Sequence, residues 1–307
     1  MTTELFVEQL LNGLQFGFML FLMSAGLTLI FGVMGLINLA HGSFYMIGAF
    51  SAAAMAAAFG SFWLSLLASL IFASIAGVLV ELTVIRRLYD RDHLDQVLAT
   101  FALILLFSES VRWIFGAYPL YLDVPEFLSG SIQIMGEIYY SKYRLFIILV
   151  GLLLALFLFI LIGKTNLGIQ IRAGQHDREM ISALGVDISK LYTFLFGIGA
   201  ALAGLAGALV GTIQSVEVGM GEPVLILAFV VIVIGGIGSI KGALLASLIV
   251  GSVDTMGRFL VPWVLVSFTD PSRAMSIGSA IASILIYVLM AIVLIIKPTG
   301  LYGKGLT

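Results

Sequence analysis

The chain has 307 residues, of which 61% are hydrophobic and only 10% are charged, and its mean hydropathy is +1.16. Soluble domains carry about a quarter charged residues, so this composition indicates a membrane protein. The net charge of −2 excludes a broad basic surface for nucleic acid, and the absence of Cys excludes disulfides and thiolate metal sites.

Apolar runs long enough to cross a bilayer as helices recur along the whole sequence. The alternating pattern of barrel strands is absent, so we predict an all-α, polytopic helical membrane protein with a single transmembrane domain over 1–307. The first residues, MTTELFVEQLL, are acidic and lack a small-residue cleavage site, which argues against a removable signal peptide. We expect about nine spans, within a range of eight to ten, at about 10–33, 43–59, 62–84, 97–115, 144–162, 191–213, 223–240, 243–266 and 277–296.

Basic residues predict how these spans are oriented. With the polar segment 163–190 in the cytoplasm, alternation places ten Lys and Arg residues inside and five outside or near the outer face. Since positive charge is concentrated in cytoplasmic loops, nine spans predict an outer N-terminus and a cytoplasmic C-terminus. Residues 116–143 then form the longest outer loop, with tyrosines typical of an interfacial belt.

The first two predicted spans are joined by GVMGLINLAHGSF, which places Asn38, His41 and Gly42 where the apolar run has hardly stopped. Broken helices beside translocation paths place polar groups in this way, because unwound backbone at membrane depth must face protein or water. A tight cytoplasmic turn with a capping Asn explains the same residues, and both interpretations stay open. Gly235 and Gly238 occupy similar places in the later stretch 235–242, which suggests a parallel repeat.

Two charge pairs lie inside predicted spans. Glu109 and Arg112 are three residues apart, and Asp254 and Arg258 are four apart, so each pair shares a helix face. Intramembrane charges mark functional sites by default, but residues near span ends can also reach the membrane surface. The remaining acidic residues are expected mostly at span ends or in loops.

The polar segment 163–190 contains DREMISALG, which has helix-forming residues, an Asp at its start and a Gly at its end. Met180, Ile181 and Leu184 form a short apolar stripe. Such a helix could insert into a groove on a cytoplasmic partner, or it could simply lie at the interface and connect two spans.

The next predicted span carries small residues at four-residue spacing, at Gly199, Ala203, Gly207 and Gly211. This spacing is typical of a face for close helix contact. The pattern does not say whether the contact lies within the chain or between subunits.

Five ordered motifs together resemble one family, the LivH-type permeases of branched-chain amino acid ABC importers. These motifs are GLTLIFGVMGLINLAHGSFYMIGAF, IRAGQHDREMISALGVD, AALAGLAGAL, VIVIGGIGSIKGALLASLIVG and KPTGLYGKG. The resemblance covers about residues 10 to 304. It implies a permease subunit in a bacterial inner membrane that translocates branched-chain or other hydrophobic amino acids.

The resemblance also implies partners and site residues. The partners are ABC ATPases, a second related permease in a heterodimer, and a periplasmic substrate-binding protein. ATP and Mg²⁺ would be bound by the ATPases, and this chain would hold no cofactor and no metal. The coupling contact would involve Asp177, Arg178, Glu179, Ala183, Leu184 and Gly185. Glu179, Ala183 and Gly185 correspond to the acidic, small and glycine positions of the family pattern, although Met180, Ile181 and Ser182 depart from the general coupling consensus.

Other functions fit the sequence less well. Gly163, Lys164 and Thr165 resemble the end of a P-loop, but Leu158 stands where the first glycine is required, so we expect no ATP site here. Related permeases that import urea, short amides or aromatic acids are the main alternative. An ion-coupled secondary transporter would need buried acids near the bilayer centre, and a membrane enzyme would need a cluster of catalytic or metal-binding groups.

Overall fold

The computed structural model describes residues 3–135 and 138–303 and is mainly helical. The long helices are α1 (Thr3–Met34), α2 (His41–Phe59), α3 (Phe62–Thr83), α4 (His93–Phe115), α5 (Lys142–Lys164), α8 (Ile188–Val210), α10 (Ile240–Leu265) and α11 (Pro271–Ile296). The shorter elements are α6 (Asn166–His176), α7 (Arg178–Ala183), α9 (Gly221–Gly235), the 3₁₀ helices η1 (Ile85–Leu88) and η2 (Glu126–Leu128), and the strands β1 (Ser131–Met135) and β2 (Ile138–Ser141).

Eight of the helices in the described residues are long and apolar enough to cross a membrane. The span expected at 223–240 is instead the 15-residue helix α9. At 1.5 Å per residue α9 is about 22 Å long, which is shorter than the roughly 30 Å hydrocarbon core. The polytopic helical fold is therefore confirmed, and the ninth predicted span is corrected to a short helix flanked by irregular segments.

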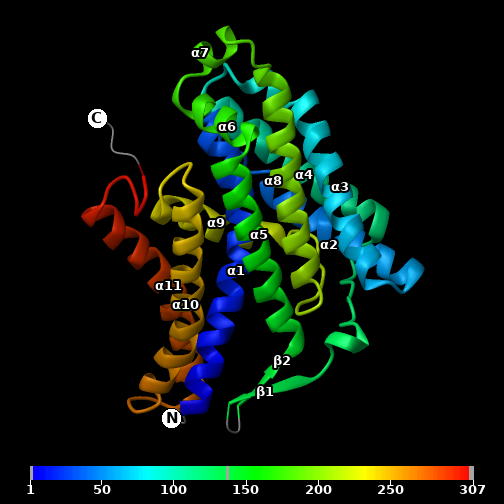
Figure 1. The fold of residues 1–307 in the computed structure, drawn as a ribbon. Coiled ribbons are helices and arrows are strands. Elements are labelled where there is room, and N and C mark those ends of the chain that lie inside the picture. The colour runs from blue at the N-terminus through cyan, green and yellow to red at the C-terminus, as the bar shows by residue number, and fades with distance from the viewer. Residues whose placement is uncertain (1–2, 136–137, 304–307) are drawn as a thin grey trace.

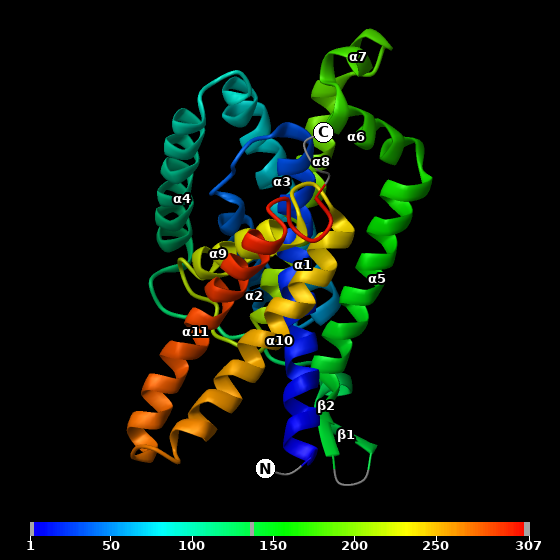
Figure 2. The same ribbon diagram turned by 90° about the vertical axis from the view of Figure 1, so that its left-hand side faces the viewer.

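The helices form an interior and a periphery. In the most apolar windows of α1 and α8, 83% and 78% of the residues are buried. The same fraction is only 17% in α4 and α5 and 11% in α11. Figure 2 shows α1 between α5 on one side and α10 and α11 on the other. The apolar side chains of α4, α5 and α11 thus face outward and require an apolar environment.

Helix α1 approaches its neighbours closely at glycines. A Cβ atom on Gly17 would lie 2.9 Å from the Cα of Leu248 in α10. One on Gly26 would lie 2.5 Å from the carbonyl oxygen of Gly199 in α8. Only a residue without a side chain fits at such distances. Close backbone approach of this kind supplies the packing energy that holds helices together within lipid.

Helices α6 and α7 lie at the opposite end of the molecule from the start of α1. Figure 1 shows α6 and α7 at one end, and the start of α1 with the β1–β2 hairpin at the other. The last described residues, drawn in red, lie in the same half as α6 and α7. The two ends of the described chain are thus on opposite halves of the structure.

The C-terminal residues complete the end of α9. The backbone N–H of Leu301 donates to the carbonyl of Ile234 at 2.8 Å, and that of Tyr302 donates to the carbonyl of Gly235 at 3.0 Å. The last carbonyl groups of a helix lack partners within it, and water is scarce at membrane depth. The motif that begins at Lys297 therefore closes the short helix.

The segment 116–143, which was expected to be the longest outer loop, contains a short β-hairpin. Strand pairing aligns Ser131 with Ser141 and Ile132 with Tyr140. Ile and Tyr are favoured in strands, which explains the local preference. Tyr140 is buried, and this burial raises the pKa of its hydroxyl to about 12.

Candidate functional site

The polar segment between α5 and α8 folds into two helices, of which the sequence analysis predicted only the second. Asp177 caps α7, because its Oδ1 accepts the backbone N–H of Met180 at 2.9 Å. Gly185 has a φ of +87°, a left-handed conformation that commonly ends a helix. The predicted stretch 177–185 is thus α7 with its two flanking turns.

Helix α7 lies at the tip of the molecule (Figure 1). Met180 and Leu184 are 62% and 78% exposed, whereas Ile181 is buried and anchors the helix. Four of the predicted coupling residues besides Leu184 are also exposed, namely Asp177, Glu179, Ala183 and Gly185. The side chain of Arg178 lies outside the described part of the chain. A short helix with exposed apolar side chains is suited to a groove on another protein.

Helix α6 connects this tip to the centre of the molecule. Ile171 is buried in the main apolar cluster. A Cβ atom on Gly32, near the end of α1, would lie 3.0 Å from Nε2 of Gln175 and 2.5 Å from the Cα of Gly238. The ends of α6 and α1 and the turn between α9 and α10, which contains Gly238, therefore meet at one point.

The four small residues of α8 that were predicted as a packing face are all buried: Gly199, Ala203, Gly207 and Gly211. Gly199 lies against α1. A Cβ atom on Gly207 would lie 2.0 Å from the carbonyl oxygen of Tyr45 in α2. These contacts lie within the chain, which answers the question that the sequence pattern left open.

The connection between α1 and α2 runs through the interior. Asn38 and His41 are completely buried. Oδ1 of Asn38 accepts the backbone N–H of Ala40 at 3.0 Å, as a capping Asn would. Among the described residues, Nδ2 of Asn38 and both ring nitrogens of His41 have no hydrogen-bond partner, and the nearby Met23 carbonyl is not at hydrogen-bonding geometry. Unpaired buried polar groups are rare and call for an explanation.

Glycines fix α9 at both of its ends. A Cβ atom on Gly221 would lie 1.8 Å from the carbonyl oxygen of Gly42 in α2. At the other end, a Cβ atom on Gly242 would lie 2.0 Å from the carbonyl oxygen of Gly235. Gly42 and Gly235, both predicted beside the path, are thus contact points between the short helix α9 and its neighbours.

A buried charge network joins the end of α3 to η1 and the first turns of α8, and it was not predicted. Glu81 in α3 has no exposed surface. Its Oε1 accepts from Nε of Arg86 and the hydroxyl of Tyr89, at 3.0 and 2.7 Å. Its Oε2 accepts from Nη2 of Arg86 and the hydroxyl of Thr193, at 3.0 and 2.7 Å. The hydrogen bond to Glu81 raises the pKa of Arg86, and burial followed by the bond to Glu81 raises the pKa of Tyr89.

Glu81 lies in the last turn of α3, which agrees with the expectation that acidic residues lie mostly at span ends or in loops, but its complete burial was not predicted. Glu81 lies within a helix that is apolar enough to span the membrane. The available signal was the acid in VLVELTVIRRLY, five positions before Arg86. Because its partner Thr193 comes from α8, sequence spacing could not reveal the complete network.

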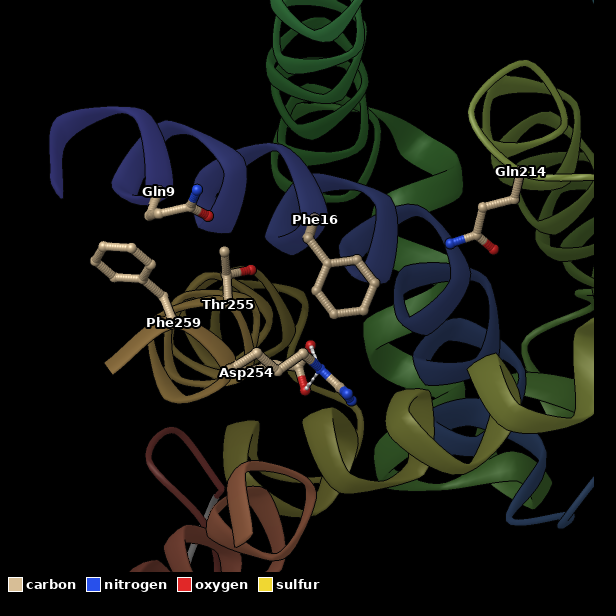
Figure 3. A pocket seen from close by; sticks show the side chains of 7 residues that line it. Gln9, Phe16, Gln214, Asp254, Thr255 and Phe259 are labelled. Carbon is tan, nitrogen blue, oxygen red and sulfur yellow. Dashed lines mark hydrogen bonds and ion pairs between the residues drawn. The ribbon is translucent and has the colours of Figure 1, made fainter. Parts of the chain in front are cut away.

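The second predicted intrahelical pair lines a pocket of about 560 Å³ between α1, α10 and the segment after α8. Asp254 is 7% exposed, and both of its carboxylate oxygens lie 3.0 Å from Nε of Arg258. Figure 3 shows Phe16 and Asp254 pointing toward one another, with Gln214 directed toward them from the side. The other predicted pair, Glu109–Arg112, lies on α4 outside this pocket and is largely exposed.

Eight long apolar helices, a short apolar helix and buried polar groups between helices are consistent with a polytopic membrane permease. The chain belongs to the family described as branched-chain amino acid transport system / permease component, whose model matches residues 9–294. This membership identifies a transport component and not an enzyme.

Relatives match over nearly the full chain. The high-affinity branched-chain amino acid transport system permease protein BraD of Pseudomonas aeruginosa is 30% identical, over 97% of this chain and 96% of that protein. The permease protein LivH of the corresponding system in Escherichia coli strain K12 is 28% identical over the same shares. A probable LivH of Methanocaldococcus jannaschii is 27% identical, over 93% of this chain and 89% of that protein. No solved structure matches the chain.

Proposed function

We propose that the chain is the membrane permease subunit of an ATP-driven importer that carries branched-chain or other hydrophobic amino acids across the inner membrane. Family membership and the branched-chain amino acid transport systems to which its relatives belong support the substrate class. The observation that carries the ATP-driven part is α7, which holds Met180 and Leu184 exposed at the tip of the molecule. A lone transporter would have no need for such a surface.

In this proposal α7 is the contact for a cytoplasmic ATPase. Its exposed apolar residues would enter a groove on that partner, and Asp177, Arg178, Glu179, Ala183 and Gly185 would surround them. ATP and Mg²⁺ are bound by the ATPase. Conformational changes of the ATPase would be transmitted to this chain through α7, and this chain itself would bind no nucleotide. The coupling segment and the C-terminus then lie in the cytoplasm, and the N-terminus lies on the outer side.

The same geometry supports a proposal for the remaining partners. A periplasmic binding protein would deliver substrate at the end of the molecule that holds the β1–β2 hairpin. A second, related permease would cover part of the apolar outer surface formed by α4, α5 and α11, which are the least buried helices. The rest of that surface would face lipid.

The translocation path would pass the helix breaks. Asn38 and His41 carry buried polar atoms without partners, and a passing substrate or water could supply the missing hydrogen bonds. Gly42, Gly235 and Gly238 fix the neighbouring ends of α2, α9 and α10. Movement of α6 would reach these breaks through the contact near Gly238.

Reconstitution tests the proposal. The chain is purified with its candidate ATPases, second permease and binding protein, and uptake of radiolabelled leucine into proteoliposomes is measured with and without ATP. We expect uptake only with ATP and the binding protein. Uptake of urea, short amides or aromatic acids in place of leucine would change the substrate class, and leucine uptake by the lone chain under an ion gradient would refute the ATP-driven mechanism.

A further inference from the structure

We propose that the pocket around Asp254 and Arg258 binds the charged head group of a zwitterionic amino acid as the substrate enters the permease. This inference rests on the proposed function and adds a binding site to it. The pocket lies in the half of the molecule away from α6 and α7, beside the first half of α1. A substrate released on the outer side would meet it before the helix breaks at Asn38 and Gly235.

The Asp254–Arg258 pair is incompletely hydrogen-bonded, in contrast to the Glu81 network. Glu81 receives four hydrogen bonds from three residues and thereby joins α3, η1 and α8. Among the described residues, Asp254 receives hydrogen bonds only from Nε of Arg258. A carboxylate can accept about four hydrogen bonds, so acceptor capacity for an ammonium group remains.

Arg258 has free donors as well. Its side chain is 50% exposed, and its Nη2 donates to the hydroxyl of Ser283 at 3.3 Å. Within the part of the chain that the structure describes, Nη1 donates to no group. A guanidinium carries five N–H groups in a planar fork that matches a carboxylate, so the outer edge of Arg258 can bind one. The pocket thus holds an anion-binding and a cation-binding group side by side.

The rest of the lining fits an amino acid with an apolar side chain. Phe16 and Phe259 supply apolar walls, and Gln9, Gln214 and Thr255 supply neutral polar groups. The charges of Asp254 and Arg258 cancel, so the pocket favours a molecule with both charges over an anion or a cation. An ion pair inside the membrane costs free energy, so it is expected to have a function. Binding a zwitterionic substrate would give the Asp254–Arg258 pair such a function.

The test compares variants of the complete transporter in the leucine uptake assay. We expect Asp254→Asn and Arg258→Gln each to lower uptake about tenfold or more, since each removes charged hydrogen bonds to the substrate. The neutral double variant Asp254→Asn/Arg258→Gln should stay equally low. If the two residues only neutralise one another, the double variant would instead recover wild-type uptake, and the proposal would be wrong.

A matched control is Glu109→Gln/Arg112→Gln, an exposed intrahelical pair outside the pocket, which should leave uptake unchanged. Size-exclusion chromatography shows whether each variant assembles with its partners. For any variant that does not assemble, Asp254→Glu/Arg258→Lys keeps both charges but displaces them, and unchanged leucine uptake in that variant would contradict the site. Wild-type vesicles without leucine uptake would refute the proposed function itself, whereas wild-type uptake that all variants retain would refute only this site.

Discussion

At the scale of single residues, three buried polar side chains differ in how completely they are hydrogen-bonded. Glu81 is saturated by Arg86, Tyr89 and Thr193, Asp254 is bound by one arginine nitrogen, and His41 has no partner among the described residues. Burying a polar group without partners costs free energy, so a saturated group can be structural. The unsaturated ones require another explanation, and under our proposals a transported ligand would provide it.

Glu81 should therefore matter for stability. We predict that Glu81→Ala lowers the free energy of unfolding by about 1–3 kcal/mol, because it removes the acceptor of the Tyr89 hydroxyl and the two hydrogen bonds that Arg86 donates to the carboxylate. Arg86 is partly exposed and can turn to solvent, which limits the loss. The measurement is thermal melting in detergent. Glu109→Ala removes an exposed ion pair and should change stability by less than about 0.5 kcal/mol; equal losses for both variants would contradict a structural role for the network.

Gly207 gives a second prediction about a single residue. Its missing Cβ atom would lie 2.0 Å from the carbonyl oxygen of Tyr45, so Gly207→Ala must push α8 away from α2. Overpacking of this kind costs about 1–3 kcal/mol, and we expect a lower melting temperature in detergent. Gly163→Ala is the matched control, because a Cβ atom there meets nothing within 4 Å. An alanine in a helix is more stable than glycine, so the control should melt at the same temperature or higher.

At the scale of elements, α7 combines a buried anchor with an exposed apolar face. We predict that Met180→Ser/Leu184→Ser abolishes co-purification of the partner ATPase, while the permease itself stays folded because Ile181 still anchors α7. Phe268→Ser serves as the control, since Phe268 is 81% exposed in the turn between α10 and α11 at the other end of the molecule. Retention of the ATPase by the α7 variant would place the coupling contact elsewhere.

The elements that could be predicted from the sequence are those whose position is determined by nearby residues, through hydropathy or helix caps. Hydropathy located the eight long spans, and Asp177 and Gly185 marked the ends of α7. The length of α9 could not be read, because the apolar pattern continues past Gly235 into a turn that the C-terminal residues stabilise from a distance. The Glu81 network and the Asp254 pocket also depend on contacts between distant segments, which no single stretch of sequence contains.

At the scale of the whole molecule, the described contacts connect the two ends of the structure. Helix α7 continues from α6, and Gln175 of α6 lies near Gly32 and Gly238. Gly238 precedes α10, and α10 carries Asp254 and Arg258 toward the other end. Since α10 packs against α1 through glycines, it can move only with that helix or by sliding along it. A change imposed at α7 therefore has a continuous physical route to the pocket.

The orientation of this route across the membrane gives the last prediction. The chain has no Cys, so single cysteines can be introduced without removing any. The exposed residues Ser129, in the outer segment, and Ser182, in α7, lie at opposite ends. In intact cells, a membrane-impermeant maleimide should label Ser129→Cys at once and Ser182→Cys only after permeabilisation. Tyr302→Cys should behave like Ser182→Cys, because its segment bonds to the end of α9 in the same half of the molecule.

Two outcomes would contradict this arrangement in different ways. Labelling of Ser182→Cys but not of Ser129→Cys in intact cells would invert the whole molecule and remove α7 from the reach of a cytoplasmic ATPase. Labelling of Tyr302→Cys together with Ser129→Cys would mean that the chain between α8 and α10 does not cross. The second result would also require the short helix α9 to return to the side from which it entered, against its contacts with Gly42 at one end and Gly242 at the other.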